Sequence, residues 1–415
     1  MEMRVNPPLD HPRERLAQPL PLDAFLIGAA VFSVLALGAS LAVAQTSQKV
    51  KLPRLRRLDL EIAWRRDPAT GVLDVIRGKV APDNNDGIVP LASHPIQVAT
   101  RMIPVTCIVA LRDGTPVPGL KREDFRILDN GAEQVISYFD DSSQPASVAL
   151  VIDASPSVLR DAEEMKGAAD ALIDALAPLD QAAVVDFSAH TYLQLPFSDV
   201  RELIRRAVAR VDVTQLLGDV GGSNIYEAVW LTTSDLFRGR TGRKAIVLLT
   251  DGQDSGLGLT FDPASASLQS GKPSDRLTFD DVVQTLATED IQVFAVSTEN
   301  RPKVMTPEWF EAHRDSTLLT LSSRKLGIPL YTLYLAEMIR RSGGQLYFLR
   351  ETKTMAEAFR TIARRIRAEY TLGYYPSGGP GAPDKAGWHQ LHVDLAGHKN
   401  VQVLHRAAYF DPAPR

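Results

Sequence analysis

The segment between Ser147 and Glu369 alternates short apolar runs with stretches whose apolar residues recur at helical spacing. Val148–Ile152 is an uninterrupted apolar run, which is typical of a strand covered on both faces. Strands that alternate with helices predict a doubly wound, mostly parallel sheet with helices on both faces. Further strands are expected at 182–187, 192–195 (a short edge strand), 245–249, 291–296 and 346–349.

Segments of β character flank this block on both sides. Before it, apolar and polar residues alternate around Cys107, and a hairpin turn is expected at Asp129-Asn130-Gly131. After it, strands are expected at 370–375, 391–395 and 401–403. We therefore predict an α/β fold in which a doubly wound domain is flanked by β-strand segments that form a small β-sandwich. The expected boundaries are 45–100 for an irregular linker, 101–145 for an N-terminal β module, 146–368 for the α/β domain and 369–415 for a C-terminal β segment packed on the β module.

Composition excludes several classes of function. The 415 residues include 46 basic and 50 acidic side chains, so the net charge of −4 gives no electrostatic footprint for nucleic acid. The one cysteine, Cys107, excludes an internal disulfide, a Cys-rich zinc site and an iron–sulfur cluster.

The N-terminal region has the features of an export signal. Ala24–Ala44 has no charged residue and is long enough to span a bilayer as a helix. It ends in Ala42-Val43-Ala44, the small-x-small pattern after which signal peptidase cuts. A basic cluster that follows at 49–57 favours the opposite orientation. We expect 1–44 to be a signal peptide or a membrane anchor, and the rest of the chain to be exported, periplasmic or extracellular. Whether 24–44 is cleaved stays open.

Oxygen-bearing side chains follow two of the expected strands and one loop. Asp153, Ser155 and Ser157 come directly after the first strand, and alternate residues of an extended segment point the same way. Ser223 follows two glycines, and Asp251 comes directly after the apolar strand that runs through Val247–Thr250 and opens the turn Asp251-Gly252. Ligands of open doubly wound sheets bind at the carboxyl ends of the strands. Carboxylates and hydroxyls without nitrogen or sulfur suit Mg²⁺, Mn²⁺ or Ca²⁺ rather than zinc or copper.

This pattern resembles the metal-ion-dependent adhesion site of the von Willebrand factor type A domain, a Rossmann-like fold. The match consists of Asp-x-Ser-x-Ser after an apolar strand, a later Gly-Gly-Ser, and Asp-Gly after a second apolar strand. The flanks, with Pro116–Leu120 and Tyr370–Pro376, resemble a bacterial group of exported proteins related to that factor. The resemblance implies that Asp153, Ser155 and Ser157 supply the first loop's metal ligands, Ser223 the second's and Asp251 the third's. The family usually has Thr where this chain has Ser223, which implies a weaker site.

The resemblance implies a binding module without enzymatic activity. Its partner would be a protein that presents an Asp or Glu carboxylate to the divalent cation, in adhesion or assembly. Membrane contact is expected only through the N-terminal segment. Two alternatives stay open: a metal-free scaffold of an envelope complex, and, less favoured, a metal-dependent hydrolase, for which the three loops offer no His or Glu as a general base. The roles of the long loops 253–277 and 299–329 and the oligomeric state also stay open.

Overall fold

The structure is a computed structural model, and its described residues belong to one compact unit, Leu52–Arg415. The apolar segment 24–44 lies outside them. Within the described part, no helix is long and apolar enough to cross a membrane. The described residues are 52–53, 55–58, 63–66, 73–76, 102–111, 115–141, 144–211, 223–254, 260–262, 267–269, 277–313, 317–321, 323–349, 355–376, 387–398 and 401–411.

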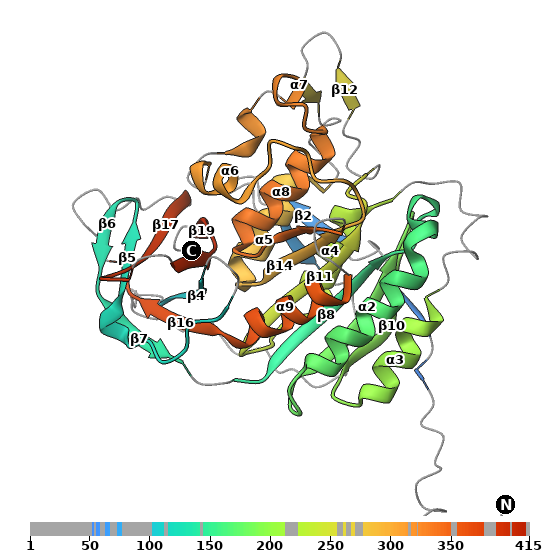
Figure 1. The fold of residues 1–415 in the computed structure, drawn as a ribbon, viewed down its shortest axis with the longest axis horizontal. Coiled ribbons are helices and arrows are strands. Elements are labelled where there is room, and N and C mark those ends of the chain that lie inside the picture. Colours follow the sequence, from blue (N-terminus) through green and yellow to red (C-terminus); the bar gives the residue numbers. More distant parts are fainter. Residues whose placement is uncertain are drawn as a thin grey trace, which may run out of the picture. The chain divides into compact units, whose positions relative to one another are not determined.

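A seven-stranded sheet forms the centre of the α/β domain (Figure 1). Five of its seven strands run parallel, namely β9 (Gln181–Phe187), β8 (Ala146–Asp153), β11 (Arg243–Thr250), β14 (Gln292–Ser297) and β15 (Leu346–Phe348). The other two, β10 (Thr191–Ser198) and β1 (Arg56–Leu58), are antiparallel to their neighbours. The expected doubly wound, mostly parallel sheet is therefore confirmed. In spatial order the strands are β1, β10, β9, β8, β11, β14 and β15.

Strand β8 shows why this sequence forms a central strand. All eight of its residues are buried. Ala149 and Val151 face one hydrophobic core, whereas Val148, Leu150 and Ile152 face the other. A strand that must be apolar on both faces has the continuous apolar run seen here, because helices cover the sheet on both sides.

Helices cover both faces of the sheet. One core contains residues of α2 (Ala162–Ala175), α3 (Arg201–Arg210) and α9 (Met355–Arg367). The other contains residues of α4 (Ile225–Leu231), α5 (Phe279–Glu289) and α8 (Leu330–Ser342). A π-helical turn, Thr232–Leu236, continues α4. Each helix buries one apolar face against the strands, and this burial is the main stabilising contribution.

The strand order reverses at the centre of the sheet. From β8 the chain proceeds outward through β9 and β10, and it then returns to β11 on the other side of β8 and proceeds through β14 and β15. The crevice outside the carboxyl ends of two strands that diverge in this way is the usual ligand site of an open α/β sheet. Here those ends are Asp153 and Thr250.

Two antiparallel four-stranded sheets lie beside the α/β domain, in the orders β18-β4-β16-β7 and β19-β17-β5-β6. Each sheet combines strands that precede the α/β domain with strands that follow it (teal and red in Figure 1). Ile127, Leu372 and Val393 are fully buried in the core that the two sheets share. The strands are β4 (Ile103–Leu111), β5 (Phe125–Asp129), β6 (Ala132–Gln134), β7 (Ile136–Asp140), β16 (Glu369–Tyr374), β17 (Gly387–Leu395), β18 (Val401–His405) and β19 (Ala408–Asp411), with a 3-10 helix at Arg122–Asp124.

The described residues of 45–100, a segment expected to be an irregular linker, contain three short strands. Strand β1 pairs with β10, so the strand expected at 192–195 is longer than predicted and is not the edge of the sheet. Strands β2 (Ala63–Arg66) and β3 (Leu73–Ile76) form a hairpin. A strand of three residues forms because it finds a partner strand in the folded chain, and it is too short to show a periodic pattern in the sequence.

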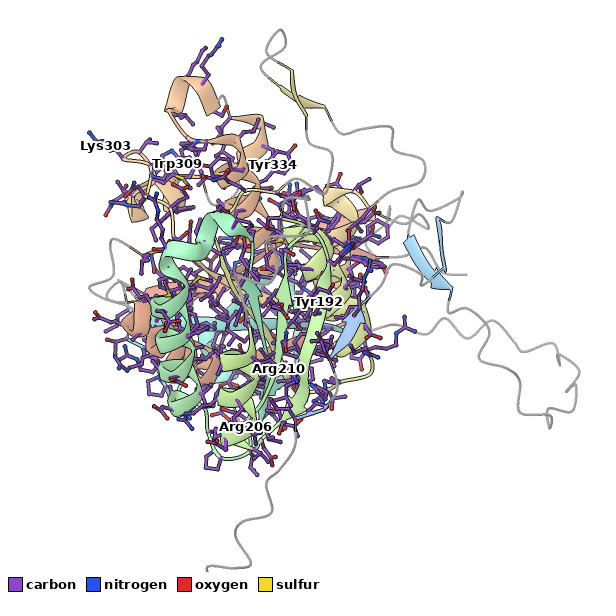
Figure 2. The ribbon with its side chains drawn as sticks, turned by 90° about the vertical axis from the view of Figure 1, so that its right-hand side faces the viewer. Tyr192, Arg206, Arg210, Lys303, Trp309 and Tyr334 are labelled. Carbon is purple, nitrogen blue, oxygen red and sulfur yellow. The ribbon has the colours of Figure 1, made fainter. Side chains whose placement is uncertain are left out.

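The two long connections after β11 and β14 have secondary structure of their own. The first contains a hairpin of β12 (Thr260–Asp262) and β13 (Ser267–Gln269). The second, 299–329, contains α6 (Pro307–Ala312), a 3-10 helix (Leu318–Thr320) and α7 (Ser323–Leu326). Its Met305, Leu318 and Ile328 are buried in the core of the α/β domain, so this insertion is a packed part of it. Figure 2 shows Trp309 of the insertion and Tyr334 of α8 at the same end of the domain, with Lys303 at its outer edge.

Candidate functional site

The first loop of the site begins where β8 ends. Asp153 is fully buried, Ser155 is 3% exposed, and the exposed Ser157 lies in a 3-10 helix, Pro156–Asp161. The backbone N–H of Ser155 donates to Asp153 Oδ1 at 2.9 Å, and the Oγ atoms of Ser155 and Ser157 are 2.9 Å apart. The predicted alternation therefore brings the two hydroxyls together beside the buried carboxylate.

The second loop contributes Ser223, whose side chain is buried. Its Oγ donates to Asp153 Oδ2 at 3.2 Å, across a separation of 70 residues. The next residue fixes the loop, since Asn224 donates from its backbone N–H to the Ser188 carbonyl at 2.9 Å and from Nδ2 to the Ala189 carbonyl at 2.8 Å. Ser223 is thus held between β8 and the turn that joins β9 to β10.

The third loop follows β11 and contributes Asp251, which is 4% exposed. Its Oδ1 accepts from the backbone N–H of Gln253 at 2.9 Å, and Gly252 makes the turn with φ of 88°. A side chain at Gly252 would meet Leu335 at 3.3 Å and Tyr331 at 3.5 Å, so α8 packs closely against this loop. Asp254 Oδ2 accepts from the backbone N–H of Tyr226 at 3.4 Å and connects the loop to α4.

The electrostatics of the site favour a bound cation. Burial raises the pKa of Asp153 to about 6, against the hydrogen bonds from Ser155 and Thr250, and the charge of Asp251 adds to the increase. Among the described residues, no ion pair joins Asp153 or Asp251 to a basic side chain. Two neighbouring carboxylates without a positive partner are a costly arrangement in a buried place unless a cation binds them.

The donor set fits a hard divalent cation. The five predicted residues supply only carboxylate and hydroxyl oxygens, which Mg²⁺, Mn²⁺ and Ca²⁺ prefer. Within the described part of the chain, no three His, Cys, Asp or Glu side chains are grouped as a metal site. A site at Asp153 therefore depends on the serine hydroxyls, as the sequence pattern predicts.

The structure brings Asp153, Ser155, Ser157 and Ser223 into one hydrogen-bonded cluster. Asp251 lies beside them at the end of the adjacent strand β11. Sequence reasoning missed Thr250, whose hydroxyl donates to Asp153 Oδ2 at 2.7 Å. The sequence feature that could have identified Thr250 is a hydroxyl at the end of an apolar strand, directly before Asp251.

Three solved structures illustrate what the chain resembles. BatB from Bacteroides thetaiotaomicron is 19% identical, and the match covers 53% of this chain and 97% of that one, with a TM-score of 0.35. A von Willebrand factor type A protein from Catenulispora acidiphila is 14% identical over 76% of this chain and 75% of its own, with a TM-score of 0.35. Proximal thread matrix protein 1 from the mussel byssus, with a zinc-occupied MIDAS motif, is 14% identical over 57% and 49%, with a TM-score of 0.38.

A comparison with curated protein sequences finds no significant match. A family model described as the von Willebrand factor type A domain matches residues 148–253. That segment extends from β8 to the turn after β11 and includes all five predicted site residues. Residues 148–253 of this chain therefore match the von Willebrand factor type A domain.

Proposed function

We propose that this protein binds a divalent cation of the Mg²⁺, Mn²⁺ or Ca²⁺ type and, through it, an Asp or Glu carboxylate of a partner protein. Asp153, Ser155, Ser157, Ser223 and Asp251 would hold the cation. The observation that carries the proposal is the buried carboxylate of Asp153, to which residues of all three loops contribute hydrogen bonds or charge and which has no basic partner among the described residues.

The chemistry of these residues favours binding over turnover. A bound divalent cation would supply a coordination position for an incoming carboxylate. The residues of the chain orient their oxygens and hold two negative charges at the carboxyl end of the sheet. The described residues of the three loops, 153–157, 223–224 and 251–254, offer neither His nor Glu as a general base. We therefore propose a non-enzymatic role.

Titration of the chain with Mn²⁺, followed by the electron paramagnetic resonance signal of the free ion, tests metal binding. Asp153→Asn keeps the shape of the side chain and removes its charge, so we expect at least a tenfold loss of affinity. Asp186→Asn is the matched control. Asp186 is also a buried carboxylate, on the adjacent strand β9, but its Oδ1 accepts from Gln194 Nε2 at 2.7 Å, and its loss should leave Mn²⁺ affinity unchanged. Equal affinity of wild type and Asp153→Asn would contradict the proposed site.

Capture of partners from cell envelopes tests the second half of the proposal. The protein would be presented with Mg²⁺, with a chelator, and as Asp153→Asn. We expect specific partners only in the first case. Retention of the same partners in all three cases would contradict metal-bridged binding and favour a metal-free scaffold. Hydrolysis of phosphate or acyl esters that is lost in Asp153→Asn would favour an enzyme instead.

We also propose that the protein is exported. The support is the charge-free segment Ala24–Ala44 and its ending Ala42-Val43-Ala44. Protease treatment of intact cells and of spheroplasts locates the chain, and N-terminal sequencing of the recovered protein distinguishes cleavage before Gln45 from retention as an anchor. A chain that stays protected until the cytoplasm is opened would contradict export.

A further inference from the structure

The hydroxyl of Thr250 bridges the first and third loops of the site. Thr250 is the last residue of β11 and is fully buried. Its Oγ1 donates to Asp153 Oδ2 at 2.7 Å and accepts from the backbone N–H of Gly252 at 3.0 Å. The sheet fixes its backbone, since Thr250 pairs with Ser297 of β14 and its carbonyl accepts from the Thr298 N–H at 3.1 Å.

The direction of these two hydrogen bonds is settled by their chemistry. A hydroxyl has one proton and two lone pairs, whereas a backbone N–H can only donate. The bond from Gly252 therefore occupies a lone pair of Thr250, and the hydroxyl proton is directed at Asp153. A hydrogen bond to a carboxylate is about twice as strong as a bond between neutral groups.

The contact limits the rotation of the Asp153 carboxylate. Oδ1 accepts from the Ser155 N–H, and Oδ2 accepts from Thr250 and from Ser223. Of the two contacts at Oδ2, the one from Thr250 is shorter, 2.7 Å against 3.2 Å, and comes from a strand rather than a loop. Removal of the Thr250 hydroxyl would thus leave Oδ2 with the weaker contact alone.

We propose that Thr250 is a positioning residue of the metal site. It orients the carboxylate of Asp153 and fixes the turn at Gly252, which places Asp251. This inference rests on the proposed function, because it assigns Thr250 a role toward the cation held by its neighbours. Groups that orient metal ligands typically change metal affinity by about 10–100-fold when they are removed.

Three variants of the chain test this role. Thr250→Val keeps the shape of the side chain and removes the hydroxyl, and Thr250→Ser restores the hydroxyl. Thr232→Val is the matched control, since Thr232 is fully buried and its Oγ1 has no hydrogen-bond partner among the described residues. We expect Mn²⁺ affinity to fall about tenfold or more in Thr250→Val and to stay close to wild type in Thr250→Ser and Thr232→Val.

Hydrogen exchange of the metal-free protein gives a second readout. The Gly252 amide should exchange at least tenfold faster in Thr250→Val than in wild type, because it loses its acceptor. Unchanged exchange, or unchanged Mn²⁺ affinity in a Thr250→Val protein that has wild-type circular dichroism, would overturn the positioning role. Absence of Mn²⁺ binding to the wild type would instead overturn the proposed function, and the exchange of Gly252 would still decide whether Thr250 fixes the turn.

Discussion

The guanidinium Nε of Arg243 lies 3.7 Å from Glu369 Oε2, and their side chains are only 5% and 1% exposed. Arg243 belongs to the central sheet and Glu369 to the β-sandwich, so the pair joins the α/β domain to the β-sandwich. Arg243 also donates to the backbone carbonyls of Arg367 at 2.8 Å and Glu369 at 2.7 Å. Among the described residues, the carboxylate oxygens of Glu369 have no hydrogen-bond partner. Because this carboxyl is buried, the stability of the fold depends on whether the carboxyl is ionised.

Stability should fall as the pH rises because of Glu369. Burial raises the pKa of Glu369 to about 8, against the charge of Arg243, whereas the pKa of Glu in an unfolded chain is about 4.3. The contribution of this group is therefore fully present below pH ~4 and is lost as the pH rises through ~8, by up to about 1.4 kcal/mol for each pH unit. Urea unfolding of wild type and Glu369→Gln at pH 5, 7 and 9 measures it.

We expect Glu369→Gln to gain stability relative to wild type as the pH increases. Glu289→Gln is a control, because Glu289 is a more exposed carboxylate that pairs with Lys244 at 3.6 Å. Parallel pH profiles of wild type and Glu369→Gln would show that ionisation of this carboxyl does not destabilise the fold.

Glu337 should hold the insertion 299–329 in place. It is fully buried on α8, and its carboxylate accepts from the Leu318 N–H at 3.0 Å, from Arg340 Nη2 at 2.9 Å and from Arg341 Nε at 2.7 Å. Burial raises the pKa of Glu337, but Arg340 and Arg341 outweigh it and lower the pKa overall, so this contribution is present at neutral pH and is lost in acid.

Glu337→Ala should cost about 1–3 kcal/mol of unfolding free energy, since it leaves buried donors without their acceptor. Limited proteolysis should then cut within 299–329 before it cuts elsewhere in the described part of the chain. Glu163→Ala, at a carboxylate that is 93% exposed, is the control and should leave the cleavage pattern unchanged. Wild-type resistance of Glu337→Ala would mean that apolar packing alone fixes the insertion.

The apolar pattern predicts the α/β domain well because each strand and helix must bury its own side chains. The apolar run Val148–Ile152 and the helical stripe around Leu172 each indicate which side chains are buried in the core. The five residues predicted as metal ligands also lie close together, because the carboxyl ends of parallel strands meet at one edge of the sheet; that they bind a cation stays a prediction. The fold class follows from local patterns that agree with one another.

Other features depend on partners that are distant in the sequence. Strand β1 exists because Arg56–Leu58 pairs with β10, and no local pattern marks it. The acceptor role of Glu337 depends on Leu318, which is 19 residues away. In the sequence nothing distinguishes Thr250 from other strand residues, because its contact with Asp153, at 2.7 Å from its hydroxyl, is made only in the folded chain. Such contacts are decided by tertiary packing.

Gly344 should tolerate no side chain. A Cβ at this position would lie 1.9 Å from the Val293 carbonyl oxygen, which is backbone and cannot move aside. Gly344→Ala should therefore be strongly destabilised or fail to fold. Gly167 is exposed in α2 with nothing within 4 Å of its Cβ position, so Gly167→Ala should stabilise the chain by about 0.5–1 kcal/mol. Thermal unfolding of both variants checks that Gly344→Ala lowers stability and Gly167→Ala raises it. Wild-type stability of Gly344→Ala would refute the close approach of the Gly344 and Val293 backbones.

The strength of the metal site should depend on the side chain at position 223. Ser223 is 6% exposed and its Oγ donates to Asp153 Oδ2 at 3.2 Å, so Ser223→Ala removes both a candidate ligand and this contact. We expect its Mn²⁺ affinity to fall about tenfold or more. Ser223→Thr keeps the hydroxyl and adds a methyl group that restricts χ1, so its affinity should equal or exceed that of wild type.

The matched control for Ser223 is Ser188→Ala. Ser188 is 2% exposed and lies in the turn against which the second loop is held. Its hydroxyl has no hydrogen-bond partner in the part of the chain that the structure describes. Its affinity should match wild type, because only the hydroxyl is removed and the carbonyl that accepts from Asn224 remains. Equal Mn²⁺ affinity of wild type, Ser223→Ala and Ser188→Ala would place the cation away from the second loop. A loss in both alanine variants would instead indicate that the turn as a whole shapes the site. Only a loss confined to Ser223→Ala assigns the hydroxyl itself to the cation.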